Sequence, residues 1–449
     1  MVSLKVAGAR GFKMALLAVL LLAAPLSAQE GLVLLDGFTA DWAAVEALAG
    51  DPAGDGAPGG ADFDSLWAVN QHGWLLLRFR TGGEFILQED NDLRLLLDTD
   101  LDAGTGLPSS GIGADLVWRF GDKSGTYFPP GGGPVTVGHF DLRLVTAPTV
   151  SGGEFEVALR RDAHPTGQAE LLGGPGVRIA LEEVRTGGDR FPDSGGVQFT
   201  FSPDPGPPID TLSLDRLDSA HVRLVTWNVL YDGIASRPEP FRRVLQAIQP
   251  DIIALQEVWS TEPAAVRGML DAWLPLPGPL GWNAVKVNGD LIVASRWPIT
   301  ASWPIPEARA SAHLIEAPGT GPVLVIDAHY PCCGNNEGRQ WEIDATMAWL
   351  RDAMQPGGVV TLEENTPVII TGDMNLVGWR QQVETLQTGQ IVNTDFFGTG
   401  APPDWDGSEL ADLVSRQSAL MMSYTWRGDA SVFSPGRLDY ILYTDSRLS

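Results

Sequence analysis

The chain has 449 residues, which is longer than a typical single domain and predicts at least two domains. It carries 56 acidic against 30 basic residues, so its formal net charge is −26. This charge opposes non-specific binding to polyanions and to anionic membranes, and it weighs against a protein that binds nucleic acid through a basic groove. It leaves open a phosphate substrate that cations bridge to the protein.

Residues 1–28 have the pattern of a secretory signal peptide. Three basic residues precede an apolar run at 14–24, and Ala28 offers a small residue at the cleavage site. The run is short for a membrane span, although an uncleaved anchor is an alternative. No later segment of the sequence suits a span, so we expect a secreted or periplasmic protein without stable membrane insertion.

Residues 31–203 are predicted to form an all-β sandwich that acts as an accessory domain. Short alternating apolar runs, separated by Gly, Pro and Asp clusters, indicate strands at 74–80, 92–97, 140–145, 155–159, 177–181 and 197–201. A Pro- and Gly-rich segment follows, so we place a linker at 204–218 and a second domain at 219–449.

One turn of the first domain is rich in carboxylates. Asp98, Asp100 and Asp102, followed by Gly104, resemble an oxygen-rich calcium loop. The bidentate acid that closes an EF-hand is absent, and strands rather than helices flank the turn. A Ca²⁺ site and an acidic, solvated turn are therefore the two interpretations.

Short words in the first domain are similar to those of a carbohydrate-binding family. The segments 36–42, 98–106 and 113–118 together resemble family 9 carbohydrate-binding modules. The resemblance makes carbohydrate a candidate partner of this domain. Aromatic side chains that could stack on sugar rings are Trp42, Trp67, Trp74 and Trp118. The alternative is that these residues belong to the core.

The second domain alternates strands and helices, and its strands end in polar residues. Expected strands lie at 221–228, 251–257, 323–329 and 368–371, and expected helices at 240–248, 262–274 and 338–354. The first three strands end at Asn228, Glu257 and His329. Gly372 is expected to end the fourth, which would leave Asp373 and Asn375 on a loop and pointing the same way.

These residue types suit phosphate chemistry at one edge of a sheet. The residues fit an open Mg²⁺ or Mn²⁺ site, in which substrate and water complete the coordination. They supply the carboxylate of Glu257, the neighbouring carboxylate and amide of Asp373 and Asn375, and the imidazole of His329. The amides and His329 would stabilise added charge. Each residue also has a plainer interpretation, because Asp373 could belong to an Asx-rich turn and His329 could be a satisfied core histidine.

Five short words occur in the order that is found in the endonuclease/exonuclease/phosphatase superfamily. They are Thr226-Trp-Asn228, Leu255-Gln-Glu257, Ala328-His329, Thr371-Gly-Asp-Met-Asn375 and Arg437-Leu-Asp-Tyr440. The resemblance implies an α/β four-layer sandwich, with two packed β-sheets flanked by helices, and a metal-dependent phosphodiesterase. The site residues that it implies are Glu257 as metal ligand beside Asn228, His329 and Asn375 on the phosphate, Asp373 positioning water, and Asp439 orienting a second histidine.

The resemblance leaves the substrate open. We expect extracellular nucleic acid first, with a sphingomyelin-like phospholipid or another phosphate ester as alternatives. A rival of another class is a catalytically inactive protein that binds carbohydrate or a surface. The sequence gives no indication of the oligomeric state.

Two features depart from the family pattern. No histidine follows Asp439, although the family carries its second catalytic histidine in a later Ser-Asp-His word. We therefore expect a fragment whose C-terminal strand is missing, with an inactive relative as the alternative. Cys332 and Cys333 are adjacent, and a vicinal disulfide, two free thiols or a soft-metal site are possible for them.

Overall fold

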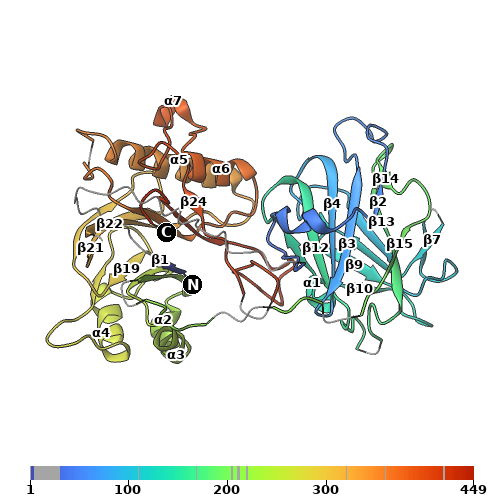
Figure 1. Ribbon diagram of the computed structural model, residues 1–449, viewed down its shortest axis with the longest axis horizontal. Helices are drawn as coiled ribbons and strands as arrows, with labels where there is room; N and C mark the ends of the chain where they lie inside the picture. The colour runs from blue at the N-terminus through green and yellow to red at the C-terminus, as the bar shows by residue number, and fades with distance from the viewer. Residues whose placement is uncertain are drawn as a thin grey trace, which may run out of the picture. The chain divides into compact units, whose positions relative to one another are not determined.

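A computed structural model describes residues 2–4, 31–109, 111–167, 169–203, 206–209, 213–218, 221–319, 321–358, 360–417 and 420–448. The chain divides into two compact units (Figure 1). Unit 1 takes the described residues from Leu212 to Ser415, those from Leu438 onward, and strand β1 (Val2–Leu4). Unit 2 takes those up to Thr211 and the segment 416–437, which the sequence-based division had assigned to the C-terminal domain.

Unit 2 is built from antiparallel strands in two large sheets and one small one. The seven-stranded sheet has the order β10-β9-β8-β5-β13-β14, with β15 also paired to β13; the five-stranded sheet has the order β11-β12-β4-β3-β2; β6 pairs with β7. The elements are β2 (Ala49–Gly50), β3 (Ser65–Gln71), β4 (Trp74–Phe85), β5 (Leu93–Asp98), β6 (Leu107–Ser109), β7 (Ile112–Ala114), β8 (Leu116–Arg119), β9 (Ser124–Tyr127), β10 (Val135–Val137), β11 (Val145–Ala147), β12 (Gly152–Arg160), β13 (Gly176–Glu183), β14 (Arg190–Phe191) and β15 (Val197–Thr200), with a 3-10 helix (Ala40–Ala44) and helix α1 (His139–Leu142).

The core of unit 2 lies between its two large sheets. Alternate residues of β4, β5 and β12 are buried in one cluster, which is the period-2 pattern that identified these strands. Trp42, Trp67, Trp74 and Trp118 are all buried. They belong to the core, so the proposal that they stack on sugar rings is wrong.

One predicted strand of unit 2 is wrong. The run at 140–145 alternates in polarity, yet residues His139–Leu142 form helix α1 and the strand β11 begins only at Val145. The Asp141 carboxylate accepts a hydrogen bond from the Gly138 amide at 2.8 Å, which caps the start of a helical turn. Arg143 then takes a left-handed conformation that ends the turn.

The segment 416–437 packs into unit 2 against residues that precede the first strand of this unit. Met421 and Met422 are buried in one apolar cluster with Leu35 and Trp42. The Leu35 amide donates to the Met421 carbonyl at 2.7 Å, and the Ser423 amide donates to the Leu35 carbonyl at 3.1 Å. The segment is therefore part of the unit 2 core and not a surface loop of unit 1.

Unit 1 contains two mixed sheets. The first has the order β1-β16-β17-β19-β18 and the second the order β20-β21-β22-β23-β25-β24. The strands are β16 (Val222–Asn228), β17 (Ile252–Gln256), β18 (Asn283–Val285), β19 (Ile292–Ser295), β20 (Ile299–Pro304), β21 (Ala310–Ala317), β22 (Gly321–His329), β23 (Val368–Asp373), β24 (Ala411–Asp412) and β25 (Asp439–Tyr443). The helices are α2 (Gly233–Ser236), α3 (Pro238–Ile248), α4 (Pro263–Trp273), α5 (Asn336–Ala353), α6 (Arg380–Thr388) and α7 (Thr394–Phe397).

The two sheets of unit 1 pack against each other. Apolar residues of β16, β17 and β19 share one buried cluster with residues of β21, β22 and β23. The opposite face of the first sheet is covered by α3 and α4, whose buried residues Phe241, Leu245, Val266 and Leu270 recur at helical spacing. Helices α5, α6 and α7 lie on the other side of the unit (Figure 1). The β-rich, multidomain architecture expected from the sequence is confirmed.

Gly372 does not end the strand that carries Asp373, as the sequence analysis expected. Strand β23 runs through Gly372 to Asp373, and Gly372 has φ +142°. A Cβ atom at this position would meet the Ala328 carbonyl oxygen at 1.9 Å. Glycine is therefore required because strands β22 and β23 approach closely there, and Asp373 keeps its place in the sheet.

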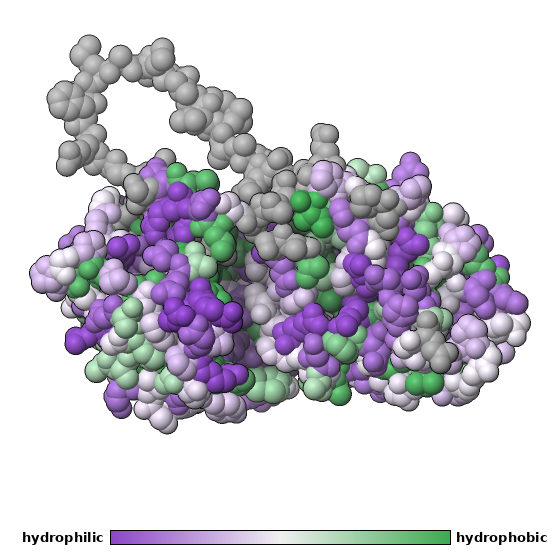
Figure 2. All heavy atoms as spheres, turned by 90° about the horizontal axis from the view of Figure 1, so that it is seen from below, coloured by the Kyte–Doolittle hydropathy of each residue, from purple (hydrophilic) through white to green (hydrophobic). Residues whose placement is uncertain are grey.

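The N-terminal region is described in part only. The predicted signal peptide at 1–28 lies outside the described residues apart from β1, which pairs antiparallel with β16. No helix of the described part of the chain combines the length and apolar character that a membrane crossing needs. Hydrophilic side chains dominate the face shown in Figure 2, and apolar ones are scattered among them.

Candidate active site

The ends of three strands place two carboxylates on one amide. Asn228 is the last residue of β16, Glu257 follows β17, and Asp373 ends β23. The Asn228 Nδ2 atom donates to Glu257 Oε1 at 2.9 Å and to Asp373 Oδ2 at 2.8 Å. One side-chain amide thus links acids from both sheets of unit 1, although these residues lie far apart in sequence.

A buried histidine and carboxylate complete this cluster. His329 Nδ1 lies 2.7 Å from Asp290 Oδ2, and His329 Nε2 lies 3.9 Å from Asp373 Oδ2. The same Asp290 oxygen accepts the Glu257 amide at 2.9 Å. Asp290 therefore fixes the imidazole and the Glu257 backbone together.

Sequence reasoning missed Asp290 because it considered only strand ends. Asp290 precedes β19, which runs antiparallel to β17 with Leu255 opposite Ile292. The start of an antiparallel strand lies at the same edge as the end of its neighbour. An acid directly before a buried apolar run was the signal that could have identified it.

The acids and the histidine of the cluster influence one another's protonation. Burial raises the pKa of the Asp373 carboxyl, against the hydrogen bond from Asn228 and the charge of His329, and the charge of Glu257 adds to the increase. Burial alone would lower the pKa of His329, but the hydrogen bond and charge of Asp290 outweigh it and raise this pKa. Burial opposes ionisation of Asp290 too, yet its bond to His329 leaves its pKa lowered. The pair therefore favours an imidazolium beside a carboxylate.

Asn375 and Asp439 lie in the same neighbourhood but are held differently. Asp439 stands opposite Asp373 in the β23–β25 ladder. Asn375 has φ +51°, so it does not continue an extended segment, and its Nδ2 atom donates to the Tyr330 carbonyl at 3.1 Å. The expectation that Asp373 and Asn375 point the same way because both are extended is wrong. The structure nonetheless brings all six predicted residues to one edge of the sheets.

The donor set fits a hard divalent cation in a site that uses few protein ligands. Asp373 Oδ1 is buried and has no hydrogen-bond partner among the described residues. Glu257 supplies a second carboxylate that shares the Asn228 amide with Asp373. Mg²⁺ commonly takes one or two carboxylates and keeps water or substrate phosphate for its other positions. These residues would therefore hold such an ion through Glu257 beside Asn228.

Groups of three carboxylates occur elsewhere, in unit 2. Asp98 and Asp100 converge with Asp115, all with oxygen atoms within 4.8 Å of one another, and not with Asp102. Asp102 is exposed and accepts the Gly104 amide at 2.9 Å. The predicted loop is thus an acidic cluster, but its third member comes from the turn before β8.

Asp98 differs from the other members of this cluster. It is fully buried, Oδ2 accepts from Arg178 at 2.8 Å, and Oδ1 has no hydrogen-bond partner in the described part of the chain. Burial raises the pKa of Asp115, against the hydrogen bonds from Thr99, and the charge of Asp100 adds to the increase. An uncompensated carboxylate oxygen in such a place is a potential cation ligand.

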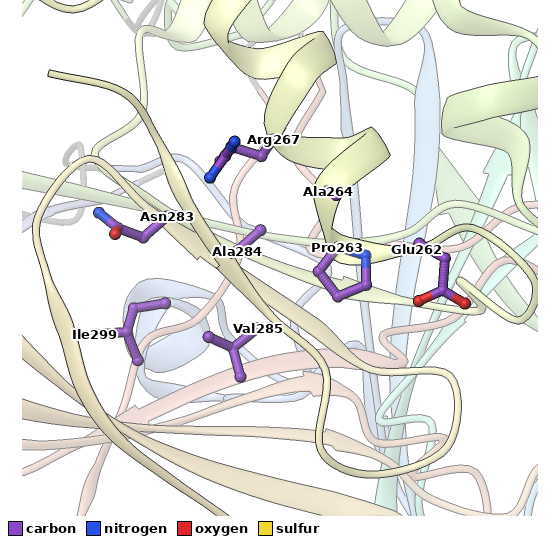
Figure 3. Close-up of a pocket in the computed structure, with 8 residues that line it drawn as sticks. All are labelled: Glu262, Pro263, Ala264, Arg267, Asn283, Ala284, Val285 and Ile299. Atoms are coloured by element: carbon purple, nitrogen blue, oxygen red, sulfur yellow. The ribbon is translucent and has the colours of Figure 1, made fainter. Parts of the chain in front are cut away.

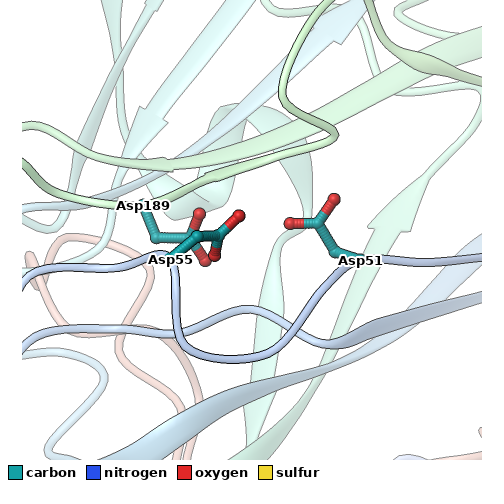
Figure 4. Close-up of side chains that lie close together, drawn as sticks. All are labelled: Asp51, Asp55 and Asp189. Carbon is teal, nitrogen blue, oxygen red and sulfur yellow. The ribbon is translucent and has the colours of Figure 1, made fainter.

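A second acidic group was not predicted. The carboxylates of Asp51, Asp55 and Asp189 turn towards one another (Figure 4). Burial, followed by repulsion from the neighbouring acids, raises the pKa of Asp51 to about 6. Both oxygens of Asp189 accept backbone amides, from Phe63 and Arg190. Hydrogen bonds of the protein thus hold part of this group in place.

A surface hollow of about 450 Å³ lies in unit 1 (Figure 3). Residues of α4, β18 and β20 and the turn before α4 line it: Glu262, Pro263, Ala264, Arg267, Asn283, Ala284, Val285 and Ile299. None of the predicted site residues is among them. The cluster around Asn228 and Asp373, rather than this hollow, is therefore the candidate active site.

Cys332 and Cys333 follow the strand that carries His329. Both side chains are exposed and are not joined by a disulfide. The fully buried Arg339 donates to the Cys333 carbonyl at 3.2 Å and to Asn336 Oδ1 at 2.7 Å. Its guanidinium therefore anchors the loop between β22 and α5.

Comparison with known protein families identifies the class to which this chain belongs. The family model described as the Endonuclease/Exonuclease/phosphatase family matches residues 225–449, and the chain belongs to this family. Members of the family are phosphodiesterases and related hydrolases, and they commonly use divalent metals such as Mg²⁺. The family predicted from the five short words is confirmed.

Several solved structures are similar to about half of this chain. An endonuclease/exonuclease/phosphatase from Bacteroides vulgatus is 17% identical, with a TM-score of 0.34, over 50% of this chain and 87% of that one. Humanized D. rerio TDP2 is 16% identical, with a TM-score of 0.34, over 50% and 84%. A beta toxin variant from Staphylococcus aureus with bound magnesium ions is 17% identical, with a TM-score of 0.31, over 50% and 84%. No curated protein matches the chain.

Proposed function

We propose that this chain hydrolyses phosphodiester bonds and uses Mg²⁺ or Mn²⁺ held by Glu257 beside Asn228. The observation that carries the proposal is the single amide of Asn228, which joins Glu257 and Asp373 while His329 lies 3.9 Å from the latter. A bound divalent cation would neutralise charge on the phosphoryl oxygens. The remaining steps belong to side chains of this protein.

Asp373 is the group that orients the attacking water and takes its proton. Asn228 holds the Oδ2 atom of this carboxylate through its amide, and His329 lies 3.9 Å from the same atom. The His329 imidazolium, fixed by Asp290, donates to a phosphoryl oxygen as negative charge grows. Asn375 has a second N–H beyond the one that it gives to Tyr330, and this donor serves the same oxygen.

We also propose that the protein is extracellular and that nucleic acid is its first substrate class. Asp439 is proposed as the residue that orients the second histidine of the family. The basic and apolar pattern of residues 1–28 supports export. N-terminal sequencing of protein made in a secreting host tests this, and a mature chain that starts after Ala28 is expected. A chain that keeps Met1 and stays inside the cell would contradict it.

The catalytic proposal is tested with bis(p-nitrophenyl) phosphate. Chelation should abolish hydrolysis, and added Mg²⁺ or Mn²⁺ should restore it. Glu257→Gln should raise the metal concentration needed for half-maximal rate, while Glu262→Gln, an exposed acid five residues later, should not change it. Hydrolysis that is indifferent to both chelation and Glu257→Gln would rule out this assignment.

A further inference from the structure

The turn directly after Asn228 is strained. Leu230, Tyr231 and Asp232 have φ angles of +51°, +49° and +58°, a left-handed conformation at three successive residues that are not glycine. This conformation costs an L-residue about 1–2 kcal/mol. Such strain persists only where neighbouring groups enforce it, and it concentrates at functional sites.

The candidate active site itself enforces this strain. The Leu230 amide donates to Asn228 Oδ1 at 2.9 Å, and the Tyr231 amide donates to Glu257 Oε2 at 3.0 Å. The Asp232 amide donates to the Glu257 carbonyl at 2.9 Å. Three successive backbone donors are therefore bound by the two residues proposed to hold the cation.

A second loop is fastened to the first. The Asp232 carboxylate accepts the amides of Ser260 and Thr261, each at 2.9 Å. Lys286 Nζ donates to the Trp259 carbonyl at 2.8 Å. The loop after Glu257 is thus fixed both to the strained turn and to the segment that leads to Asp290.

Both loops expose large aromatic side chains next to buried apolar ones. Val229 and Val258 are buried and belong to the core of unit 1. Tyr231 is 74% exposed and Trp259 is 46% exposed. The valine of each loop packs in the core, whereas the aromatic side chain of each loop is accessible to a ligand.

We propose that Tyr231 and Trp259 bind a nucleobase, the base of the nucleoside whose sugar hydroxyl is esterified to the scissile phosphate. The inference rests on the proposed function and names the residues that recognise its substrate. Exposed aromatic side chains on two loops that are hydrogen-bonded to each other and to Asn228 and Glu257 suit a flat π-face, which every base offers. A lipid surface is disfavoured, because the neighbours of the two aromatic residues in sequence include the polar residues Asp232, Ser260 and Thr261.

Two phosphodiesters with the same leaving group test the proposal. Thymidine 5′-(p-nitrophenyl phosphate) carries a base, and methyl p-nitrophenyl phosphate does not. Tyr231→Ala and Trp259→Ala should each lower kcat/KM for the nucleoside ester by about 5- to 150-fold, the range expected for one lost stacking contact. Both should lower kcat/KM less for the methyl ester than for the nucleoside ester, and Tyr231→Phe should retain activity on the nucleoside ester.

The outcomes separate this inference from the catalytic proposal. Phe38→Ala removes an aromatic side chain that is 50% exposed in unit 2 and should affect neither ester. Equal losses on both esters, or no loss on either, would overturn the base platform while the hydrolase assignment stands. Weaker sedimentation of the variants with phosphatidylcholine vesicles, with the nucleoside ester unaffected, would assign the rings to lipid instead.

A binding measurement covers the case in which neither ester is hydrolysed. Equilibrium dialysis with thymidine 5′-monophosphate in Mg²⁺ should show tighter binding than methyl phosphate, and Trp259→Ala should remove the difference. Equal binding of the two phosphates by the unaltered protein would overturn the inference without any turnover.

Discussion

Replacing Met422 by alanine tests whether the segment 416–437 is part of the unit 2 core. Met422 is 3% exposed and packs in the cluster that contains Leu35 and Trp42, so alanine removes nearly the whole buried side chain and leaves a cavity. Substitutions of this kind cost about 2–5 kcal/mol. Since whole domains are stable by about 5–15 kcal/mol, the loss should be a large fraction of the stability of unit 2.

Hydrogen exchange, measured for each segment of the chain at increasing urea concentrations, shows which segments lose stability. Met422→Ala should lower the free energy of opening for residues 420–437 and for the strands of unit 2. The amides of Met374 and Asn375 should keep their protection, because both bind the Leu438 carbonyl beside the five paired residues of β23 and β25.

Met347→Ala is the matched control for this experiment. Met347 is equally buried but lies in α5 of unit 1, so its loss should weaken unit 1 and leave residues 420–437 protected. A cost for Met422→Ala below about 0.5 kcal/mol, the range of ordinary surface substitutions, would refute the core assignment. Loss of protection of 420–437 in the control would refute it equally.

Two further predictions concern charged groups. Asp290→Asn should lower the pKa of His329, measured by NMR titration of metal-free protein, and should slow hydrolysis roughly 10- to 150-fold, since a hydrogen bond to a charged group contributes about 1.5–3 kcal/mol. Because the pKa of His329 is raised in the folded protein, its protonation stabilises the fold at low pH, and this stabilisation is lost as the pH rises through the folded-state pKa. Because the pKa of Asp290 is lowered, its ionisation stabilises the fold at higher pH, and this stabilisation is lost as the pH falls through the folded-state pKa. The destabilisation by Asp290→Asn should therefore be largest between the two folded-state pKa values, and a pH-independent difference would contradict the ion pair. Ca²⁺ at 100 times its Kd should stabilise unit 2 by about 2.7 kcal/mol in thermal unfolding. Asp98→Asn or Asp115→Asn should abolish this stabilisation, and Asp102→Asn should not. A stabilisation that requires Asp102 instead would contradict the observed cluster.

Much of unit 1 was predictable because its strands are buried and its helices are amphipathic. Parallel strands bring their carboxyl ends to one edge of a sheet, so Asn228 could be grouped with Glu257, and His329 with Asp373, from sequence. Asp290 could not, because it precedes an antiparallel strand whose partner is not visible in a local pattern.

The errors arose where long-range packing overrides local pattern. Gly372 looks like a strand breaker in sequence, but its role is set by the Ala328 carbonyl on another strand. The run at 140–145 fits strand alternation, yet a local cap makes it a helical turn. The placement of 416–437 depends on contacts with residues almost 400 positions earlier, which no local window reveals.

The most direct test of the active-site assignment is the rate of the His329→Ala variant. General acid–base and charge-stabilising help from such a group contributes about 10²- to 10⁴-fold. Hydrolysis of bis(p-nitrophenyl) phosphate in saturating Mn²⁺ should fall by that factor in His329→Ala, and His221→Ala, which removes the histidine directly before β16, should retain full activity. Equal rates for His329→Ala and the unaltered protein, with both correctly folded, would contradict the central claim.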